Sequence, residues 1–303
     1  MNRRVPSVLT IAGSDSGAGA GIQADLKTFA AMGVFGTTAI TAITAQNTLG
    51  VQDVLALPPE LVAAQIDAVV SDIGADVVKT GMLANAAIVD VVVAKMAEHK
   101  LDSLVVDPVM VSSSGDRLFE EDAVEAIRDR LLPLATIITP NLKEAEVLLG
   151  RKLTSWEEIR AGAEELVAMG AGAAIIKGGH SAVAASKGAA TDILYDSEGV
   201  RDYTTTRIET NNTHGTGCTF ASAIAAALAR GTNLRGSVAM AKAYVTKALQ
   251  SAYPVGQGHG PVHHFFRFWQ PGLYDAQHEA AQQAAAHEEQ AQQAAAQQTA
   301  DGK

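Results

Sequence analysis

The sequence predicts an α/β fold in which a mostly parallel sheet is doubly wound, with helices on both faces. Short β-branched runs recur along the chain, and each is followed by a Gly- or Asp-rich turn and then by a segment of helical periodicity. Most of these runs are nearly continuously apolar, as strands buried on both faces of a sheet should be. The 303 residues are enough to bury one large core, so we expect one extended domain over residues 1–275.

Each expected element follows from this alternation. The strands are expected at "SVLTIA" (7–12), "TTAITAI" (37–43), "DVVKTG" (76–81), "SLVVDPV" (103–109), "TIITP" (136–140) and "AAIIKGG" (173–179). The helices are expected at 22–33, 59–73, 85–99, 121–132, 141–149, 155–169, 218–230 and 234–252. Residues 192–208 contain two strand-like halves separated by "DSEG", which indicates a β-hairpin at the edge of the sheet.

The last residues of the chain differ in composition from the rest. Residues 276–303 contain no Leu, Ile, Val or aromatic side chain. Ala and Gln favour helix, but this segment has nothing to bury, so we expect a frayed or disordered tail that is dispensable for activity.

Charge and cysteine content exclude several classes of partner. The net charge of -10 argues against nucleic acid, and charged residues interrupt the apolar runs well short of a membrane span. The single cysteine, Cys218, cannot form an internal disulfide, and residues 1–20 lack a secretory pattern. We therefore expect a soluble protein of the reducing cytoplasm.

Ligands of an open parallel sheet bind beyond the carboxyl ends of its strands, so the turns there are the candidate sites. The first is "GSDSGAGAGIQADLK", residues 13–27, which matches neither a dinucleotide fingerprint nor a P-loop. Its glycines would let the backbone approach a ligand, and Asp25 could accept a hydrogen bond from a hydroxyl or a ring nitrogen. A tight strand-to-helix turn with an acid near the helix start explains the segment equally well.

The second turn is "TAQNT", residues 44–48. A side-chain amide can pair with a ring nitrogen and the adjacent amino group, so Gln46 and Asn47 could read the edge of an aminopyrimidine. From spacing alone, a turn centred on Asn47 is the better interpretation.

Two acidic residues and a lysine lie at or just after the ends of other expected strands. Asp107 ends a buried strand and Glu144 lies one turn into the next helix, and two carboxylates near phosphates suit Mg²⁺. Either acid alone is better explained as a turn or capping residue. Lys177 also ends a buried strand, which favours a phosphate contact over a mere ion pair.

The segment "HGTGC", residues 214–218, combines a Gly-rich turn with a helix start. Its backbone amides could stabilise a developing negative charge, and a helix N-terminus would lower the pKa of Cys218 toward neutrality. An ordinary cysteine would instead be buried and inert.

His259, His263 and His264 lack metal-ligand spacing and are expected to be packed or solvated, while the role of His214 stays open.

Taken together, these motifs resemble one enzyme family. "AGSDSGAGAGIQADLKTF", "TAITAQNT", "KTGM", "VVDPVM", "TPNLKEAE", "KGGH", "HGTGC" and "GHGPVHH" resemble, in this order, the hydroxymethylpyrimidine and phosphomethylpyrimidine kinases of thiamine biosynthesis, within the ribokinase-like superfamily. The resemblance spans roughly residues 5–265. It implies a ribokinase-like domain, usually dimeric, that uses ATP and Mg²⁺ to phosphorylate 4-amino-5-hydroxymethyl-2-methylpyrimidine to its monophosphate and then its diphosphate.

The resemblance also implies roles for single residues. The pyrimidine site would consist of Gly13, Asp25, Gln46, Met82 and Val109. Asp107 and Glu144 would serve Mg²⁺ and the phosphates, and Lys177 the transferring phosphoryl group. Gly215, Thr216 and Gly217 would supply anion-stabilising amides, and Cys218 would replace the aspartate base of other superfamily members, close to the attacking hydroxyl. The first loop distributes its glycines differently from many relatives, and the tail has no counterpart in the family.

Three alternatives stay open at this point. A pyridoxine or pyridoxal kinase also phosphorylates a hydroxymethyl group on a nitrogen heterocycle, but "TAQNT" disfavours it. A hydroxyethylthiazole kinase fits the cysteine but not "TAQNT" or "KTGM". A catalytically idle, pyrimidine-binding regulatory module is disfavoured by the intact Lys177, Asp107, Glu144 and "HGTGC" segment.

Overall fold

The computed structural model describes residues 4–110, 121–178 and 188–269. Residues Met1–His264 form one compact unit, and Phe265–Lys303 form a second. The expected domain boundary at residue 275 lies outside the described residues and stays a prediction. No helix in the described part of the chain has the length and apolar character that a membrane span requires.

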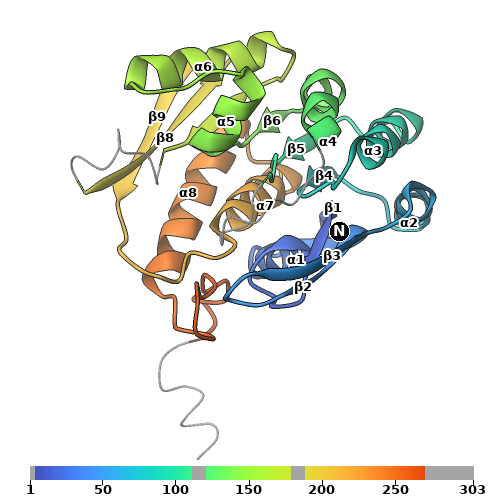
Figure 1. Cartoon of the computed structure of the whole chain (residues 1–303), viewed down its shortest axis with the longest axis horizontal. Coiled ribbons are helices and arrows are strands. Elements are labelled where there is room, and N and C mark those ends of the chain that lie inside the picture. The colour runs from blue at the N-terminus through green and yellow to red at the C-terminus, as the bar shows by residue number, and fades with distance from the viewer. Residues whose placement is uncertain (1–3, 111–120, 179–187, 270–303) are drawn as a thin grey trace, which may run out of the picture. The chain divides into compact units, whose positions relative to one another are not determined.

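The first unit is built on one sheet (Figure 1). Within the described residues its strands are β1 Ser7–Asp15, β2 Phe35–Gln46, β3 Val51–Ala56, β4 Val77–Thr80, β5 Leu104–Val106, β6 Ile137–Ile138, β7 Ala174–Lys177, β8 Ala189–Asp196 and β9 Gly199–Thr206. Their order across the sheet is β3-β2-β1-β4-β5-β6-β7-β8-β9. The pairs from β2 to β7 are parallel, and β3, β8 and β9 are antiparallel to their neighbours.

Helices cover both faces of the sheet, as Figure 1 shows. They are α1 Gly21–Ala31, α2 Pro59–Asp72, α3 Ala86–Glu98, α4 Glu121–Ala126, α5 Leu142–Leu149, α6 Trp156–Ala168, α7 Thr216–Ala229 and α8 Leu234–Gln250. Helices α1, α7 and α8 pack together on one face, while α2, α3, α4, α5 and α6 lie on the other. The predicted doubly wound α/β fold is confirmed.

The sheet divides the buried core into two parts, one on each of its faces. On β1, Leu9 and Ile11 belong to the hydrophobic cluster beneath α2 and α3, whereas Val8 and Thr10 are buried on the opposite face. Because successive strand residues point to opposite faces, a strand covered on both sides must be apolar almost throughout. This explains why the predicted parallel strands read as continuous apolar runs.

The structure confirms the edge hairpin and corrects the opposite edge of the sheet. Strands β8 and β9 form the hairpin predicted over 192–208. No strand was predicted at Val51–Ala56, where β3 pairs with β2. This strand lies at the sheet edge with mostly exposed side chains, so it lacks the apolar run by which a buried strand is recognised. The helix expected at 121–132 is α-helical only to Ala126, and a π-helical turn, Ile127–Leu131, follows.

Candidate active site

A cavity of about 1160 Å³ lies beyond the carboxyl ends of the parallel strands. Its lining includes residues that end or follow β1, β2, β4, β5 and β7, together with the first turn of α7. The predicted site residues that line it are Gly13, Gln46, Met82, Asp107, Val109, Glu144, Lys177, Gly215, Thr216, Gly217 and Cys218. The topology therefore gathers into one cavity side chains that are far apart in the sequence.

Asp15 organises the loop after β1. Its carboxylate accepts hydrogen bonds from the backbone N–H groups of Gly17, Gly19 and Ala20 at 2.8–3.0 Å. Nε2 of His214 lies 2.8 Å from Oδ2 of Asp15. Burial alone would raise the pKa of Asp15, but the hydrogen bonds from His214 and the loop lower it. Asp15 therefore stays ionised and joins the loop after β1 to the segment before α7.

The turn before α7 depends on a glycine. Gly215 is the N-cap of α7 with φ +78°, a left-handed conformation that L side chains rarely adopt. A Cβ atom there would also collide with the carbonyl oxygen of Gly19 in the first loop. The close contact of these two loops aims the first turn of α7 into the cavity, and the N–H groups of a first turn lack intrahelical acceptors. The local geometry suits an anion.

Lys177 and Asp107 meet at this helix start. Nζ of Lys177 lies 3.1 Å from Oδ1 of Asp107, and both side chains are largely buried. A Cβ atom on Gly217 would lie 3.2 Å from this Nζ and 3.8 Å from Oδ2 of Asp107, so the backbone of α7 passes close to both charges. Burial alone would lower the pKa of Lys177, but Asp107 and Glu144 raise it and keep the ammonium charged.

Glu144 approaches the same place from α5. Oε2 of Glu144 accepts a hydrogen bond from the backbone N–H of Asn141 at 2.7 Å, and Oδ1 of Asn141 accepts one from the N–H of Glu144 at 3.0 Å. This capping box fixes the start of α5. Burial raises the pKa of Glu144 to about 7, with Lys177 acting in the opposite direction and Asp107 adding to the rise. A cation bound nearby would therefore stabilise the ionised form of Glu144.

Gln46 presents an oriented amide at another part of the cavity. Its Oε1 accepts a hydrogen bond from the hydroxyl of Thr44 at 3.2 Å, and its Nε2 lies 3.5 Å from Nε2 of His214. Asn47 does not line the cavity; its Oδ1 accepts hydrogen bonds from the N–H groups of Leu49 and Gly50. Of the two amides considered from the sequence, Gln46 faces the cavity and Asn47 builds the turn.

The structure corrects the placement of Asp25. Its side chain is fully buried and does not line the cavity. Both carboxylate oxygens bond to Nζ of Lys79, and the hydroxyls of Thr10 and Ser222 donate to them as well. A carboxylate so surrounded has no lone pair left for a ligand in the cavity, because protein donors already occupy it.

The expected lowering of the Cys218 pKa is also wrong. Burial raises the pKa of this thiol to about 12, and the positive charge of Lys79 only partly opposes the rise. Desolvation disfavours a thiolate more strongly than the helix start favours it. Cys218 does line the cavity, so it faces the site as a neutral thiol rather than as a ready base.

Sequence reasoning missed three residues of this region. Asp15 and Lys79 lie inside quoted motifs but were not singled out, and His214 was left without a role. A charged residue in a strand read as apolar, such as Lys79 in "DVVKTG", was the available signal, because a buried ammonium needs a partner. His264 is packed as expected, with Nε2 3.0 Å from the hydroxyl of Thr219.

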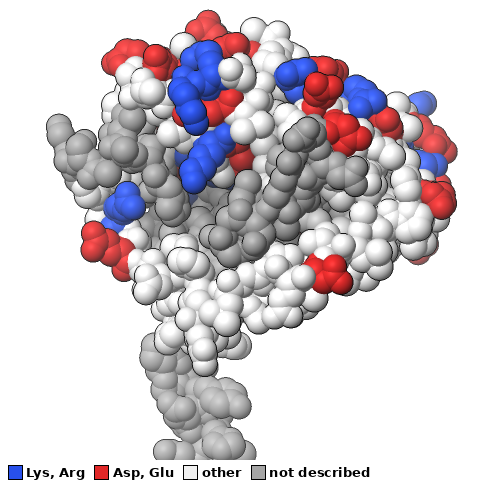
Figure 2. Space-filling model, in the orientation of Figure 1, with Lys and Arg blue, Asp and Glu red and all other residues white. Residues whose placement is uncertain are grey.

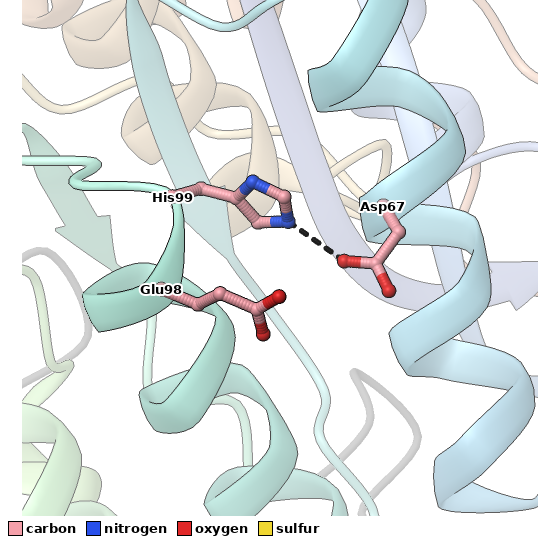
Figure 3. A group of neighbouring side chains, drawn as sticks. All are labelled: Asp67, Glu98 and His99. Atoms are coloured by element: carbon pink, nitrogen blue, oxygen red, sulfur yellow. Dashed lines mark hydrogen bonds and ion pairs between the residues drawn. The ribbon is translucent and has the colours of Figure 1, made fainter.

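A second cluster of potential metal ligands lies outside the cavity. Asp67 of α2 and Glu98 and His99 at the end of α3 point toward one another (Figure 3). However, Nζ of Lys95 lies 2.7 Å from Asp67 and 2.8 Å from Glu98. The Lys95 ammonium therefore occupies the place that a metal ion would take. The cluster is an ion-paired bridge between two helices.

The sequence comparisons with known proteins indicate one family. The family model described as phosphomethylpyrimidine kinase matches residues 15–263. The bifunctional thiamine biosynthesis protein ThiED of Geobacter sulfurreducens is 50% identical over 268 residues, which are 87% of this chain and 54% of that protein. The hydroxymethylpyrimidine/phosphomethylpyrimidine kinase of Rhizobium meliloti is 49% identical over 266 residues, covering 86% of this chain and 98% of the relative. The chain thus spans about half of the first relative and nearly all of the second.

A solved structure shows the same fold. The pyridoxal kinase from Staphylococcus aureus in complex with AMP-PCP and pyridoxal superposes with a TM-score of 0.80 at 37% identity. The superposition covers 88% of this chain and 96% of that one. The structural likeness therefore extends over most of both chains.

Proposed function

The chain belongs to the phosphomethylpyrimidine kinase family, and we propose that it phosphorylates 4-amino-5-hydroxymethyl-2-methylpyrimidine with ATP and Mg²⁺. The first transfer yields the monophosphate and the second yields the diphosphate, as a step of thiamine biosynthesis. One observation supports this function most directly: a single cavity holds the amide of Gln46 together with Lys177, Asp107 and the first turn of α7.

Gln46 is proposed to read the aminopyrimidine edge. Its Nε2 donates to a ring nitrogen while its Oε1 accepts from the exocyclic amino group, which is the pairing that a side-chain amide makes with such an edge. The hydroxyl of Thr44 lies 3.2 Å from Oε1 and 2.9 Å from the carbonyl oxygen of Ser14, so its single proton is shared between two acceptors and supports this orientation of the amide without fixing it. Gly13, Met82 and Val109 line the cavity and are proposed to contact the faces and the rim of the ring.

The donor set of the phosphate region suits Mg²⁺. Oδ2 of Asp107 is buried and has no hydrogen-bond partner among the described residues. Such an oxygen is costly unless a cation or a ligand satisfies it, and carboxylates are the hard ligands that Mg²⁺ takes. We assign Asp107 and Glu144 to the metal. When bound, Mg²⁺ would neutralise charge on the phosphates.

The chain's own groups stabilise the transferring phosphoryl group. Phosphoryl transfer needs little covalent chemistry from the protein, so catalysis consists mainly of positioning and charge stabilisation. The Lys177 ammonium and the N–H groups of Gly215 and Gly217 are proposed to hold the charge that develops on the phosphoryl oxygens. The N–H of Thr216, expected from the sequence to join them, instead donates to the carbonyl oxygen of Thr213 at 3.2 Å. Cys218, beside them in the cavity wall, is proposed to contact the attacking hydroxyl.

The experiment that tests this function uses two acceptor alcohols. Purified protein is incubated with ATP and Mg²⁺ and, in parallel, with the hydroxymethylpyrimidine or pyridoxine, and the products are identified by mass. We expect mono- and diphosphate from the pyrimidine. Product from pyridoxine alone would favour the pyridoxine kinase alternative, and no product from either would favour an idle binding module.

The assembly is proposed to be a homodimer in the cytoplasm. Ile43 of β2 and Leu55 of β3 lie directly opposite each other and are 49% and 65% exposed. Figure 2 shows few charged side chains over this edge of the sheet. An exposed apolar pair on an edge strand suits contact with a second copy of the chain. The single cysteine and its free thiol support a reducing compartment.

A further inference from the structure

A fully buried ion pair lies against the N-terminal half of α7. Nζ of Lys79, on β4, lies 2.9 Å and 3.0 Å from the two carboxylate oxygens of Asp25, on α1, and both side chains are wholly inaccessible to solvent. Burial alone would lower the pKa of Lys79, but Asp25 outweighs this and raises it. The pair therefore keeps both charges in the interior.

The pair connects four elements, β1, β4, α1 and α7. The hydroxyl of Thr10 on β1 donates to Oδ2 of Asp25 at 2.7 Å, and the hydroxyl of Ser222 on α7 donates to Oδ1 at 2.6 Å. Ser222 follows Cys218 by four residues, so both side chains lie on the same face of α7. The ion pair consequently fixes the face of α7 that carries Cys218 against α1 and β4.

Packing alone does not account for this pair. Burying two charges is expensive, and apolar side chains of similar volume often stabilise a core equally well or better. The pair also lies next to the cavity: Lys79 lines it along with Cys218 and Asp107. The positive charge of Lys79 opposes the burial that raises the pKa of Cys218, which places this charge within electrostatic reach of the thiol.

We propose that Lys79 and Asp25 are positioning residues for phosphoryl transfer: the pair holds the part of α7 that carries Cys218 in place and keeps the Lys79 ammonium at the cavity wall beside Cys218 and Asp107. This inference rests on the proposed kinase function and deepens it. Asp25 contacts α7 directly through Ser222, and Lys79 holds Asp25 in place from β4. The pair thus supports charge that develops during transfer without contacting the substrate.

The test separates charge from folding. Lys79→Met alone leaves a buried, unpaired carboxylate and is expected to lower the unfolding temperature. The double variant Lys79→Met/Asp25→Asn removes both charges and keeps hydrogen-bonding capacity for Thr10 and Ser222. We expect it to regain most of the unfolding temperature, while kcat stays about 10- to 100-fold below wild type and KM for both substrates changes little.

A matched control removes an ion pair outside the cavity. Arg235 of α8 pairs with Asp196 of β8 at 2.6 Å, and neither residue lines the cavity. Arg235→Met/Asp196→Asn is expected to keep the wild-type kcat. If Lys79→Met/Asp25→Asn also keeps the wild-type kcat at a temperature where both proteins are fully folded, the pair is structural and the proposal is overturned.

A double-mutant cycle tests the route through Cys218. In a Cys218→Ala background, removal of the Lys79–Asp25 pair is expected to reduce kcat much less than it does in wild type. Fully additive losses would overturn the assignment to this helix turn. Turnover of the pyrimidine by wild type is measured first: an inactive wild type contradicts the proposed function itself, whereas an active wild type with an equally active double variant contradicts only this proposal.

Discussion

Nζ of Lys177 lies 3.1 Å from Oδ1 of Asp107, while Oδ2 of the same carboxylate is buried without a hydrogen-bond partner among the described residues. The lysine thus satisfies one oxygen and leaves the other directed at the region where α7 begins. A cation-phosphate pair would complete this arrangement, because it offers a positive ligand for Oδ2 and a negative one for Lys177.

Asp107→Asn should weaken the use of Mg²⁺. The neutral amide keeps the size of the side chain but removes the negative charge, so we expect kcat to fall by about 100-fold and the Mg²⁺ concentration for half-maximal rate to rise. KM for the pyrimidine should change little. Initial rates over a Mg²⁺ titration measure this, and an unaltered Mg²⁺ dependence would remove Asp107 from the metal site.

Gln46→Ala should affect the pyrimidine and spare ATP. Loss of a bidentate contact is expected to lower kcat/KM for the pyrimidine by about 10- to 100-fold. ATP affinity, measured by calorimetry, should stay within error. Asn47→Asp is the control, because it keeps the side-chain oxygen that forms the neighbouring turn. Equal losses of pyrimidine turnover and ATP binding would contradict the assignment of Gln46 to the pyrimidine.

Glu144→Gln should stabilise the metal-free protein above neutral pH. Because burial raises the pKa of Glu144 to about 7, the folded state holds its proton more tightly than the unfolded state, and stability falls as pH rises toward that value. Gln keeps the capping interaction without the charge. We expect Gln to add on the order of 2 kcal/mol at pH 8 and almost nothing at pH 4.

Urea unfolding without Mg²⁺ at these two pH values measures the effect. The same variant should lose most of its kinase activity, since it lacks a metal ligand. A variant that is less stable than wild type at pH 8 would show that the buried carboxylate is already compensated within the protein.

Asp15→Asn should destabilise the protein at neutral pH but not in acid. The pKa of Asp15 is lowered in the folded state, so its contribution is complete above the ordinary aspartate pKa and is lost as pH falls through the folded value. Because the carboxylate joins two loops through charge-assisted hydrogen bonds, we expect a loss of about 2 kcal/mol at pH 7. Unfolding at pH 7 and pH 3 should show the difference shrinking; a constant difference would refute the charge-based explanation.

Leu55→Lys should dissociate the proposed dimer. A lysine opposite Ile43 places a charge in the apolar edge, where a second copy would have to bury it. Light scattering after size-exclusion chromatography should report a monomer. Val200→Lys, at the other edge of the sheet, is the control and should keep the dimer. A dimer that survives Leu55→Lys would place the interface elsewhere.

The sequence alone determined the architecture and the position of the site within it. Apolar runs followed by turns and helices are local patterns, and a parallel sheet brings the turns after its strands to one edge. The turn residues Gln46, Asp107, Glu144 and Lys177 were therefore placed correctly in one cavity. Strand β3 escaped prediction because its exposed edge position imposes no apolar run.

Only the tertiary structure decided how the buried charges are partnered. Asp25 was expected to face the ligand, and Cys218 was expected to have a lowered pKa. Instead, Asp25 forms a buried ion pair with Lys79, which lies 54 residues away in the sequence, and burial raises the pKa of Cys218. The physical reason is that desolvation and Coulomb energies depend on distances between groups that the folded chain brings together, and spacing along the sequence carries no record of those distances.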